Sequence, residues 1–400
     1  MKKPATADRA RAEQLLWSLL EIPGRSGHEA AVMEFLRARL LAAGAPAEAL
    51  RFDTAQRHTP LGGEVGNLIL KLPGTRPGPR RLLMAHVDTV PLCEGARPQR
   101  RGKWIVPADS HTGLGADDRA GTAVVLNAAL EILQNKPAHP PLVFLWTVQE
   151  EVGLYGARHL RLGLLGKPRL AFNFDGGLAS RVTVGATGGY RMTIRIRGRA
   201  SHAGVAPEKG VSAIAIAALA IAQLQRDGWH GRIEKDDGCG TCNVGVIEGG
   251  KATNVVTPEV LIEAEARSHQ PAFRRQIVRE IQRAFQTAAR SVKNTAGVCG
   301  RVKFEGRLDY EAFRLSADEP CVRAAEAAIR RASGKPERAI SNGGLDANWM
   351  AVHGIPTVSL GTGQLNPHTT QERLDTRQFH RACQIALLLA TGSEDLPASR

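Results

Sequence analysis

The chain has 400 residues and a formal net charge of +14, with 43% hydrophobic and 4% aromatic residues. This length predicts two domains, and the apolar fraction is high enough for large cores, which excludes a disordered chain. The scarcity of aromatic residues argues against stacking platforms for single-stranded nucleic acid. Because the basic residues are spread along the chain, with the densest run at 267–303, we expect no nucleic-acid partner and only a mild attraction for anionic small substrates.

Several features of the chain bear on its compartment. Its N-terminus begins with charge but lacks the uninterrupted apolar core of a signal peptide. The longest helix-compatible apolar run, 211–222, is too short to span a bilayer, so we expect no membrane association. The six cysteines are scattered. Cys239 and Cys242 form a CGTC that could be a redox pair, although no thioredoxin-like pattern surrounds it. A reduced, cytoplasmic protein is the expectation.

The first part of the chain alternates helices with short apolar strands. Helices are expected at 9–22, 28–43, 120–134 and near 155–163, and strands at 65–72, 81–85, 142–148 and 170–174. The segment 142–148 is short and uncharged, which fits a strand buried on both faces of a parallel sheet. Residues 91–112 carry glycine and proline and look irregular.

The pattern changes at about Thr187. Strands are then expected at 188–196, 241–247, 260–267 and 301–308, with helices at 211–225 and 272–290. Helices beside antiparallel-looking strands form a small α+β unit, which we interpret as an insertion. The α/β pattern returns with helices at 318–333, 346–352 and from 376, and a strand at 357–360. The predicted fold is α/β, with a mixed, mostly parallel sheet in a larger domain (1–187 and 313–400) and a smaller α+β domain (188–312).

Histidine and carboxylate side chains recur just past the expected strand ends or at helix starts. They are His86, Asp117, Glu150, Glu151, Asp175 and His368. In a doubly wound sheet such positions converge on one edge. Two histidines with several carboxylates suit zinc, and manganese or cobalt less well. Asp117 is the natural bridge between two ions, because a helix start offers a fixed backbone.

Asp88 lies two residues beyond His86, so on a strand both share one face and Asp88 could accept the other imidazole N–H. Taken singly, these residues also have structural interpretations. Asp117 and Asp118 stand where helix caps are common, and Glu150 with Glu151 could be a solvated loop between a strand and a helix.

Five blocks of this sequence resemble the signature blocks of the di-zinc metallopeptidases. They are HVDTV (86–90), GADDRAG (115–121), TVQEEVGLYGA (147–157), FDGG (174–177) and HTTQE (368–372). That family includes peptidase T, the bacterial glutamate carboxypeptidase, acetylornithine deacetylase and succinyl-diaminopimelate desuccinylase. The blocks stand in the family's order over essentially the whole chain. FDGG, and GIPTVSLGTG followed by HTTQE, are most similar to the peptidase T branch.

The resemblance implies two zinc ions per chain that share Asp117 as a bridge. His86 and Asp175 would complete the ligands of one ion, and Glu151 and His368 those of the other. The larger domain would then be the catalytic domain, and the insertion a lid or dimerisation domain.

The resemblance also implies roles for neighbouring residues. The peptide bond between Asp117 and Asp118 would be cis, and Asp88 would orient His86. Glu150 would be the general base on a metal-bridging water. The mechanism fits elementary chemistry: zinc lowers the pKa of bound water towards about 7, the resulting hydroxide attacks a polarised carbonyl, and Glu150 returns the proton to the leaving amine.

Three residues of the insertion match the family's lid. His202, in SHAG, stands where the family has a histidine that reaches an active site, often that of the partner subunit, and supports the oxyanion. Asn254, after the glycine-rich segment 245–250, would contact substrate, and Arg267 would clamp a substrate carboxylate. Without the resemblance, His202 would be a surface-loop histidine and Arg267 a strand-end charge. A homodimer is expected from the resemblance alone.

The sequence thus predicts zinc-dependent hydrolysis of the peptide bond of short peptides, in the manner of a di- or tripeptide aminopeptidase. One rival is a deacylase or carboxypeptidase that acts on N-acyl amino acids with the same machinery. Another is a non-catalytic binding protein on the same scaffold. Leu345 stands where relatives often have a small hydroxyl residue, and together with the uninterpreted segment 91–112 it leaves substrate choice open.

Overall fold

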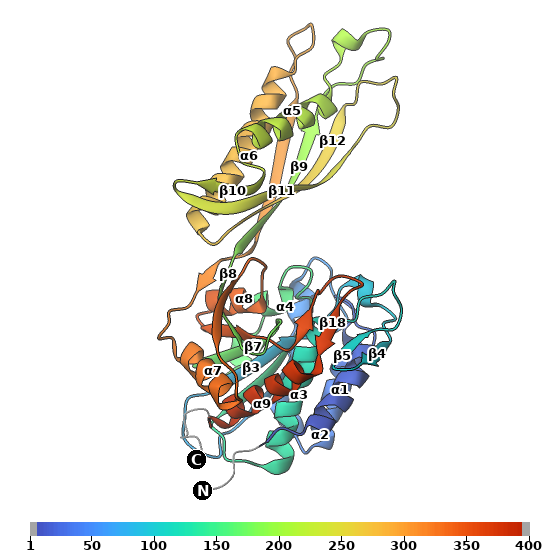
Figure 1. Ribbon diagram of the computed structural model, residues 1–400. Coiled ribbons are helices and arrows are strands. Elements are labelled where there is room, and N and C mark those ends of the chain that lie inside the picture. Colours follow the sequence, from blue (N-terminus) through green and yellow to red (C-terminus); the bar gives the residue numbers. More distant parts are fainter. Residues whose placement is uncertain (1–5, 394–400) are drawn as a thin grey trace. The chain divides into compact units, whose positions relative to one another are not determined.

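The computed structural model describes residues 6–393. The chain forms two compact units (Figure 1). Unit 1 comprises the residues up to Gly185 and those from Arg314 onward, and unit 2 is Ala186–Phe313. Each unit has a hydrophobic core of its own. Unit 2 is therefore an insertion in unit 1.

A nine-stranded mixed sheet forms the centre of unit 1. Its strands are β1 (Leu50–Phe52), β2 (Leu68–Leu72), β3 (Arg81–His86), β6 (Leu142–Thr147), β7 (Leu170–Phe174), β8 (Arg181–Ala186), β14 (Phe313–Arg314), β15 (Glu337–Ser341) and β16 (Thr357–Leu360). The order is β1-β2-β6-β3-β7-β16-β8-β14, and β15 pairs with β8. The neighbours β6, β3, β7 and β16 are parallel, whereas β2 and β8 flank them antiparallel. The predicted α/β fold with a mixed, mostly parallel sheet is confirmed.

Helices cover both faces of this sheet. They are α1 (Arg9–Glu21), α2 (Ala30–Ala42), α3 (Ala116–Asn135), α4 (Tyr155–Arg158), α7 (Pro320–Arg331), α8 (Asp346–Val352) and α9 (Thr376–Thr391). Along β6, Phe144 and Trp146 enter the larger core with α1, α2, α3, α7 and α9, and Val143 and Leu145 enter a smaller core with α8. This alternation follows from the two-residue period of a strand. All six residues of β6 are buried, as the uncharged run 142–148 predicted.

A small four-stranded sheet in unit 1 contains a segment that the sequence left irregular. Its order is β17-β18-β5-β4, with β4 (Pro98–Arg101), β5 (Trp104–Pro107), β17 (Gln364–Leu365) and β18 (Arg373–Asp375). The expectation of an irregular 91–112 is therefore wrong for β4 and β5. These strands have no clear apolar alternation, and β5 gains its partner β18 from a distant part of the chain. The expected helix near 155–163 is also shorter, because α4 ends at Arg158 and only a 3₁₀ turn follows at Leu162–Leu164.

Unit 2 is an antiparallel sheet with two helices on one face (Figure 1). Its elements are β9 (Gly188–Arg197), α5 (Ala213–Arg226), β10 (Gly231–Lys235), β11 (Gly238–Gly249), β12 (Glu259–Ser268), α6 (Pro271–Ser291) and β13 (Arg301–Tyr310). The strand order is β10-β11-β12-β9-β13. In β12, Val260, Ile262, Ala264 and Ala266 are buried in the core with both helices, and their neighbours face away. The predicted α+β character of the insertion agrees with this arrangement.

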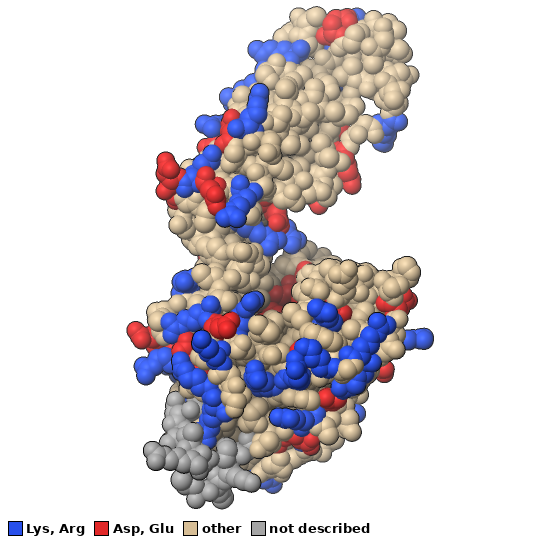
Figure 2. Space-filling view, in the orientation of Figure 1, with Lys and Arg blue, Asp and Glu red and all other residues tan. Residues whose placement is uncertain are grey.

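Positive charge is spread over the face of unit 1 drawn in Figure 2, where Lys and Arg side chains outnumber Asp and Glu. Several cations of unit 1 have a carboxylate partner; Arg330 and Arg338, for example, both pair with Glu326. No helix within residues 6–393 combines the length and the apolar character needed to cross a membrane. The absence of a nucleic-acid partner stays a prediction.

The two cysteines of the CGTC point to opposite faces of β11. Cys239 is exposed, whereas Cys242 is buried in the core of unit 2. Burial, with the charge of Glu265, raises the pKa of the Cys242 thiol to about 12. A thiol in this state is a poor nucleophile, so this arrangement argues against the redox pair.

Candidate metal centre

The predicted site residues of unit 1 gather at one edge of the large sheet. His86 is the last residue of β3, Asp175 follows β7, and the segment from Val148 to Glu151 follows β6. Because β3, β6 and β7 are parallel neighbours, their carboxyl ends meet at that edge, which is where open α/β sheets place ligands.

Asp117 and Asp118 lie in a kink at the start of α3, and their side chains have different partners. The peptide bond between them is cis, as the resemblance implied. Asp118 is fully buried, and its carboxylate accepts hydrogen bonds from the backbone N–H groups of His86 at 3.3 Å and Gly121 at 3.0 Å. The capping interpretation therefore describes Asp118, whereas Asp117 faces the histidines.

The carboxylate of Asp117 lies between two imidazoles. Its Oδ1 is 3.3 Å from Nε2 of His86, and its Oδ2 is 3.5 Å from Nε2 of His368. His368 belongs to the 366–372 loop that joins β17 to β18, and its Nε2 is also 2.9 Å from Oε1 of Glu151. A carboxylate whose two oxygens each face a different histidine has the arrangement that a bridging ligand requires.

Potential ligand atoms form two close groups. In the first, His86, Asp117 and Glu151 each offer an atom within 4.8 Å of the others. In the second, His86, Asp118 and Asp175 do so. Asp175 therefore shares a group with Asp118, whose oxygens already accept backbone hydrogen bonds. The expected sharing of one ion by Asp117 and Asp175 stays a prediction. The nitrogen and oxygen donors at these distances fit zinc, manganese or cobalt.

Negative charge is concentrated in this site. Within residues 6–393, every ion pair of Asp117, Glu151 and Asp88 is with a histidine. Burial and the charge of Asp117 raise the pKa of Asp175 to about 7. Burial raises the pKa of Glu151 to about 6, against the hydrogen bond with His368. A bound cation would offset this repulsion between carboxylates, so the electrostatics also fit a metal.

The pKa values of the two histidines are raised as well, which favours their charged form. Hydrogen bonds to Asp117 and Glu151 raise the pKa of His368 to about 10. For His86, burial alone would lower the pKa, but the charge of Glu150 and the hydrogen bonds to Asp117 and Asp88 raise it well above its ordinary value. Both shifts favour the protonated imidazole beside the carboxylates.

Glu150 is a buried carboxyl group beside this cluster. Only 8% of the residue is exposed. Burial raises the pKa of Glu150 well above its ordinary value; the charges of Glu151 and Asp175 act in the same direction and His86 opposes them. Such a group exchanges a proton readily when its surroundings change, which is what general acid–base catalysis needs.

Asp88 holds the turn that contains Glu150 and Glu151. Its Oδ1 accepts the backbone N–H of Glu150 at 2.9 Å and its Oδ2 that of Glu151 at 3.2 Å, and Ser26 donates its hydroxyl to Oδ2 at 2.6 Å. Nδ1 of His86 lies 3.1 Å from the backbone oxygen of Asp88 and 3.4 Å from its carboxylate. Asp88 is thus placed to orient His86, chiefly through its backbone, and to fix the two glutamates as well.

The sequence matches known proteins over most of its length. The profile of peptidase family M20/M25/M40 matches residues 82–391. The chain belongs to this peptidase family. The family prediction is confirmed. A Bacillus subtilis protein described as uncharacterised is 33% identical over 372 residues, which cover 93% of this peptidase and 95% of that protein. The acetylornithine deacetylase of Myxococcus xanthus is 31% identical over 381 residues, 90% of each chain.

Two solved structures are similar over nearly the whole peptidase. A tripeptidase from Staphylococcus aureus superposes with a TM-score of 0.87 at 29% identity and covers 98% of this chain and 100% of its own. The aminopeptidase PepT from Bacillus cereus gives a TM-score of 0.83 at 32% identity, with 97% and 99% covered. These likenesses agree with the predicted peptidase T-like branch.

The three predicted substrate contacts of the peptidase lie in unit 2. Nδ1 of His202 accepts the backbone N–H groups of Gly204 at 3.2 Å and Val205 at 3.1 Å. Because Nδ1 is an acceptor, the neutral ring has its proton on Nε2. Asn254 lies beside His202, since its carbonyl accepts the N–H of Ala203 at 2.9 Å.

Arg267 lies at the other end of the sheet of unit 2. It pairs with Gly189 near the start of β9, whereas the His202 loop follows the end of that strand at Arg197. The intervening length of strand is roughly 25 Å. Nε and Nη2 of Arg267 each lie 2.9 Å from an oxygen of Glu265. One copy of unit 2 therefore cannot place His202 and Arg267 on the same short peptide.

Sequence reasoning missed four groups that surround the site: the half-buried Ser26 and the buried Glu29, Asp346 and Glu372. Glu29 accepts the N–H of Gln149 at 3.1 Å, and Asp346 accepts the hydroxyl of Thr147 at 2.5 Å. Glu372 is the last residue of the HTTQE block, to which the sequence assigned no role beyond His368. The signal for Asp346 and Glu372 was their place in motif-like segments, whereas the contacts of Ser26 and Glu29 are to residues distant in sequence.

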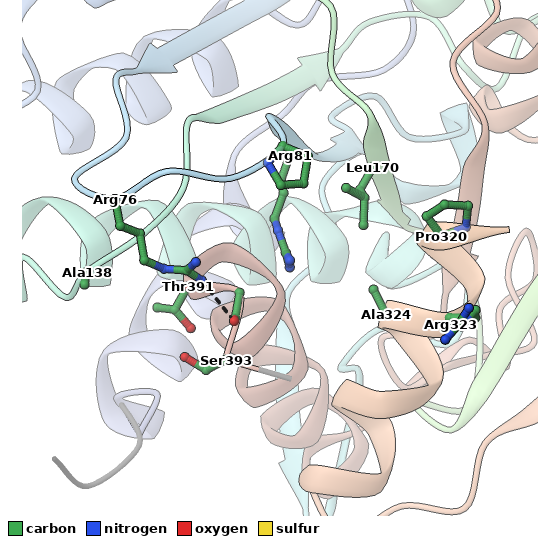
Figure 3. A pocket seen from close by; sticks show the side chains of 11 residues that line it. Arg76, Arg81, Ala138, Leu170, Pro320, Arg323, Ala324, Thr391 and Ser393 are labelled. Atoms are coloured by element: carbon green, nitrogen blue, oxygen red, sulfur yellow. Dashed lines mark hydrogen bonds between the residues drawn. The ribbon is translucent and has the colours of Figure 1, made fainter. Parts of the chain in front are cut away.

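A cavity of about 820 Å³ in unit 1 is separate from this site (Figure 3). It is lined by residues that include Arg81 and Leu170, the first residues of β3 and β7, so it lies at the opposite ends of the strands. Arg76 donates to the carbonyls of Thr391 at 2.8 Å and Gly392 at 3.0 Å, and Arg81 donates to that of Leu389 at 2.8 Å. These arginines cap the carboxyl end of α9.

Proposed function

We propose that this peptidase is a zinc-dependent aminopeptidase that hydrolyses short peptides such as di- and tripeptides. The observation that supports this most is the placement of Asp117 between His86 and His368, next to the buried Glu150. The likeness to a tripeptidase and an aminopeptidase at about 30% identity or just below supports the choice of substrate class. A cytoplasmic location remains a prediction.

Five residues would hold two metal ions, with Asp117 shared. His86 and Asp175 would complete one ligand set, and Glu151 and His368 the other. When bound, the two ions would supply Lewis-acid polarisation of the peptide carbonyl and activation of water at neutral pH. Zinc suits this set of donors; manganese or cobalt would also fit.

The protein's own groups would bind the substrate and move the proton. Glu150, fixed through its backbone N–H by Asp88, would accept a proton from the attacking water and donate it to the leaving amine. His202 presents an Nε2–H donor, which suits a developing oxyanion. Asn254 beside it would contact substrate. Arg267 would have to exchange or share its partner Glu265 to clamp a substrate carboxylate.

Unit 2 would act as a lid, and a homodimer would let His202 of one copy serve the site of the other. Two observations support the dimer. Within residues 6–393, the 243–249 half of β11 is paired on one side only, by β12, and such an edge can pair with a second chain. Ile214, Ile247 and Val255 are exposed apolar side chains, and a Cβ added at Gly250, next to this edge, would lie 3.5 Å from Cδ1 of Ile214.

A deacylase that acts on N-acyl amino acids is the second candidate function. It is favoured by the 31% identity with the acetylornithine deacetylase of Myxococcus xanthus. The two reactions need the same metal ions and the same general base. They differ in whether the substrate must have a free α-amine.

The test is to measure zinc content per chain together with turnover of three substrates: a tripeptide, the same tripeptide N-acetylated, and an N-acyl amino acid. We expect two zinc ions and cleavage of the free tripeptide alone. Cleavage of the blocked substrates would move the protein to the deacylase class. A chain with neither metal nor turnover would be a binding protein on this scaffold.

A further inference from the structure

Glu372 is a buried carboxyl group at the end of the loop that contains His368. It lies four residues after His368, immediately before β18, and only 1% of it is exposed. None of the proposed catalytic steps uses it. A carboxylate this deeply buried needs hydrogen-bond donors to compensate for the loss of water.

The donors are backbone N–H groups of the turn that leads to Asp117. Oε2 of Glu372 accepts the N–H groups of Leu114 and Gly115, both at 2.8 Å. Oε1 accepts the N–H of Asp117 itself at 3.0 Å. Both carboxylate oxygens are therefore used, and the turn is fixed up to the residue that faces the two histidines.

The 366–372 loop is ordered on its own side by local hydrogen bonds. Thr369 donates its hydroxyl to the carbonyl of Asn366 at 2.8 Å, and the N–H of Glu372 bonds to the carbonyl of Thr369 at 3.1 Å. His368 has a positive φ of 62°, so its ring direction depends on this tight loop. A displacement of Glu372 would consequently move His368 as well.

The space around the carboxylate is closely filled. A Cβ atom added at Gly113 would lie 2.8 Å from Sγ of Cys93 and 3.3 Å from Oε2 of Glu372. Glycine at 113 thus permits the close approach of the turn to the carboxylate. An alanine there would disturb the contact without removing it.

We propose that Glu372 is a positioning residue that locks the 114–117 turn to the 366–372 loop, and so sets the affinity of the site for metal. The inference rests on the proposed function, because Asp117 and His368 are its suggested ligands on these two segments. Groups that orient metal ligands typically change metal affinity by about 10- to 100-fold when they are removed. Glu372 differs from a helix cap in that the same carboxylate holds two ligand segments together.

The test is the zinc affinity of Glu372→Gln, measured by competition with a chelator. An amide offers one acceptor oxygen where the carboxylate offers two, so at least one backbone N–H of the turn loses its partner. We expect zinc affinity to fall by about 10- to 100-fold. The matched control is Glu131→Gln in α3: Glu131 is 2% exposed and accepts the N–H of Asp8 at 2.8 Å, but it lies about 21 Å further along the helix from Asp117.

Thermal unfolding of both variants without metal separates positioning from stability. If both variants lose the same stability and only Glu372→Gln loses zinc affinity, the proposal is supported. If the two variants bind zinc with equal affinity, the proposal is overturned. If Glu372→Gln does not fold, Gly113→Ala replaces it, and unchanged zinc affinity in that variant also overturns the proposal. A wild-type chain that binds no divalent metal would overturn the proposed function and this inference together.

Discussion

At the scale of single residues, the carboxylates of the site differ in what they bind rather than in type. Asp118 and Glu372 are occupied by backbone N–H groups, which fix the chain around the site. Asp117 and Glu151 instead face histidine nitrogens. Because each backbone N–H removes an acceptor from metal binding, this division selects the ligands. The sequence shows adjacent carboxylates but cannot show which of them the backbone will use.

Substitution of Glu150 by glutamine should abolish proton transfer and leave the metal in place. The amide is nearly the same size but cannot accept the proton, so we expect turnover of a tripeptide to fall by about 10²- to 10⁴-fold. Zinc content should be unchanged, because Glu150 is not a proposed ligand. Steady-state kinetics and metal analysis of the same preparation measure both quantities. Near-normal turnover would remove Glu150 as the base; Glu131→Gln serves as the control for a buried carboxyl substitution.

Glu29 should make the stability of the protein depend on pH. Burial, with the charge of Asp88, raises the pKa of Glu29 from 4.5 to about 8 in the folded protein. The folded state therefore holds this proton more tightly than the unfolded state. The resulting stabilisation is complete below about pH 4.5 and is lost as the pH rises through about 8.

Glu29→Gln removes this titration, so its urea-unfolding free energy should rise relative to that of the wild type between pH 5 and pH 9. The relative change is on the order of a few kcal/mol. Comparison of the two proteins at each pH cancels the titration of other groups. A difference between them that stays constant from pH 5 to pH 9 would show that Glu29 does not titrate in this range.

At the scale of elements, the sequence predicted the segments whose burial is periodic. Strand 170–174 and helix 346–352 have the predicted bounds, because the first is apolar except for Asn173 and the second follows a glycine pair. The hairpin of β4 and β5 was missed because its residues, PQRR and WIVP, have no apolar period and pair with β18 far along the chain. The position of the site at one edge of the large sheet could be predicted, because its residues follow the ends of strands. The kink that sends Asp118 to the backbone depends on tertiary contacts.

The start of α3 should not tolerate a side chain at Gly121. A Cβ there would overlap the carbonyl oxygen of Phe174 in β7 and the carboxylate of Asp118. A backbone oxygen in a central strand cannot move aside, so Gly121→Ala should lower the unfolding free energy by roughly 3 kcal/mol. Gly163→Ala is the matched control, because nothing lies within 4 Å of its added Cβ. Chemical denaturation measures both, and equal stability of the two variants would contradict the packing argument.

At the scale of the whole molecule, unit 2 interrupts unit 1 between two neighbouring strands. β8 and β14 are adjacent in the large sheet, and the N–H of Leu315 bonds to the carbonyl of Val184 at 2.7 Å. The ends of unit 2 are equally close, since Gly189 pairs with Tyr310. Insertions whose ends meet in this way are tolerated because neither core depends on the other.

Replacement of residues 186–313 by a short glycine–serine linker should therefore leave unit 1 folded. The five proposed metal ligands all belong to unit 1, so zinc content should stay at the wild-type value. Turnover of a tripeptide should be lost, because His202, Asn254 and Arg267 are removed together. Circular dichroism, metal analysis and kinetics on one preparation distinguish the outcomes: loss of fold would show that the units depend on each other, and retained turnover would show that hydrolysis needs only the edge of the sheet.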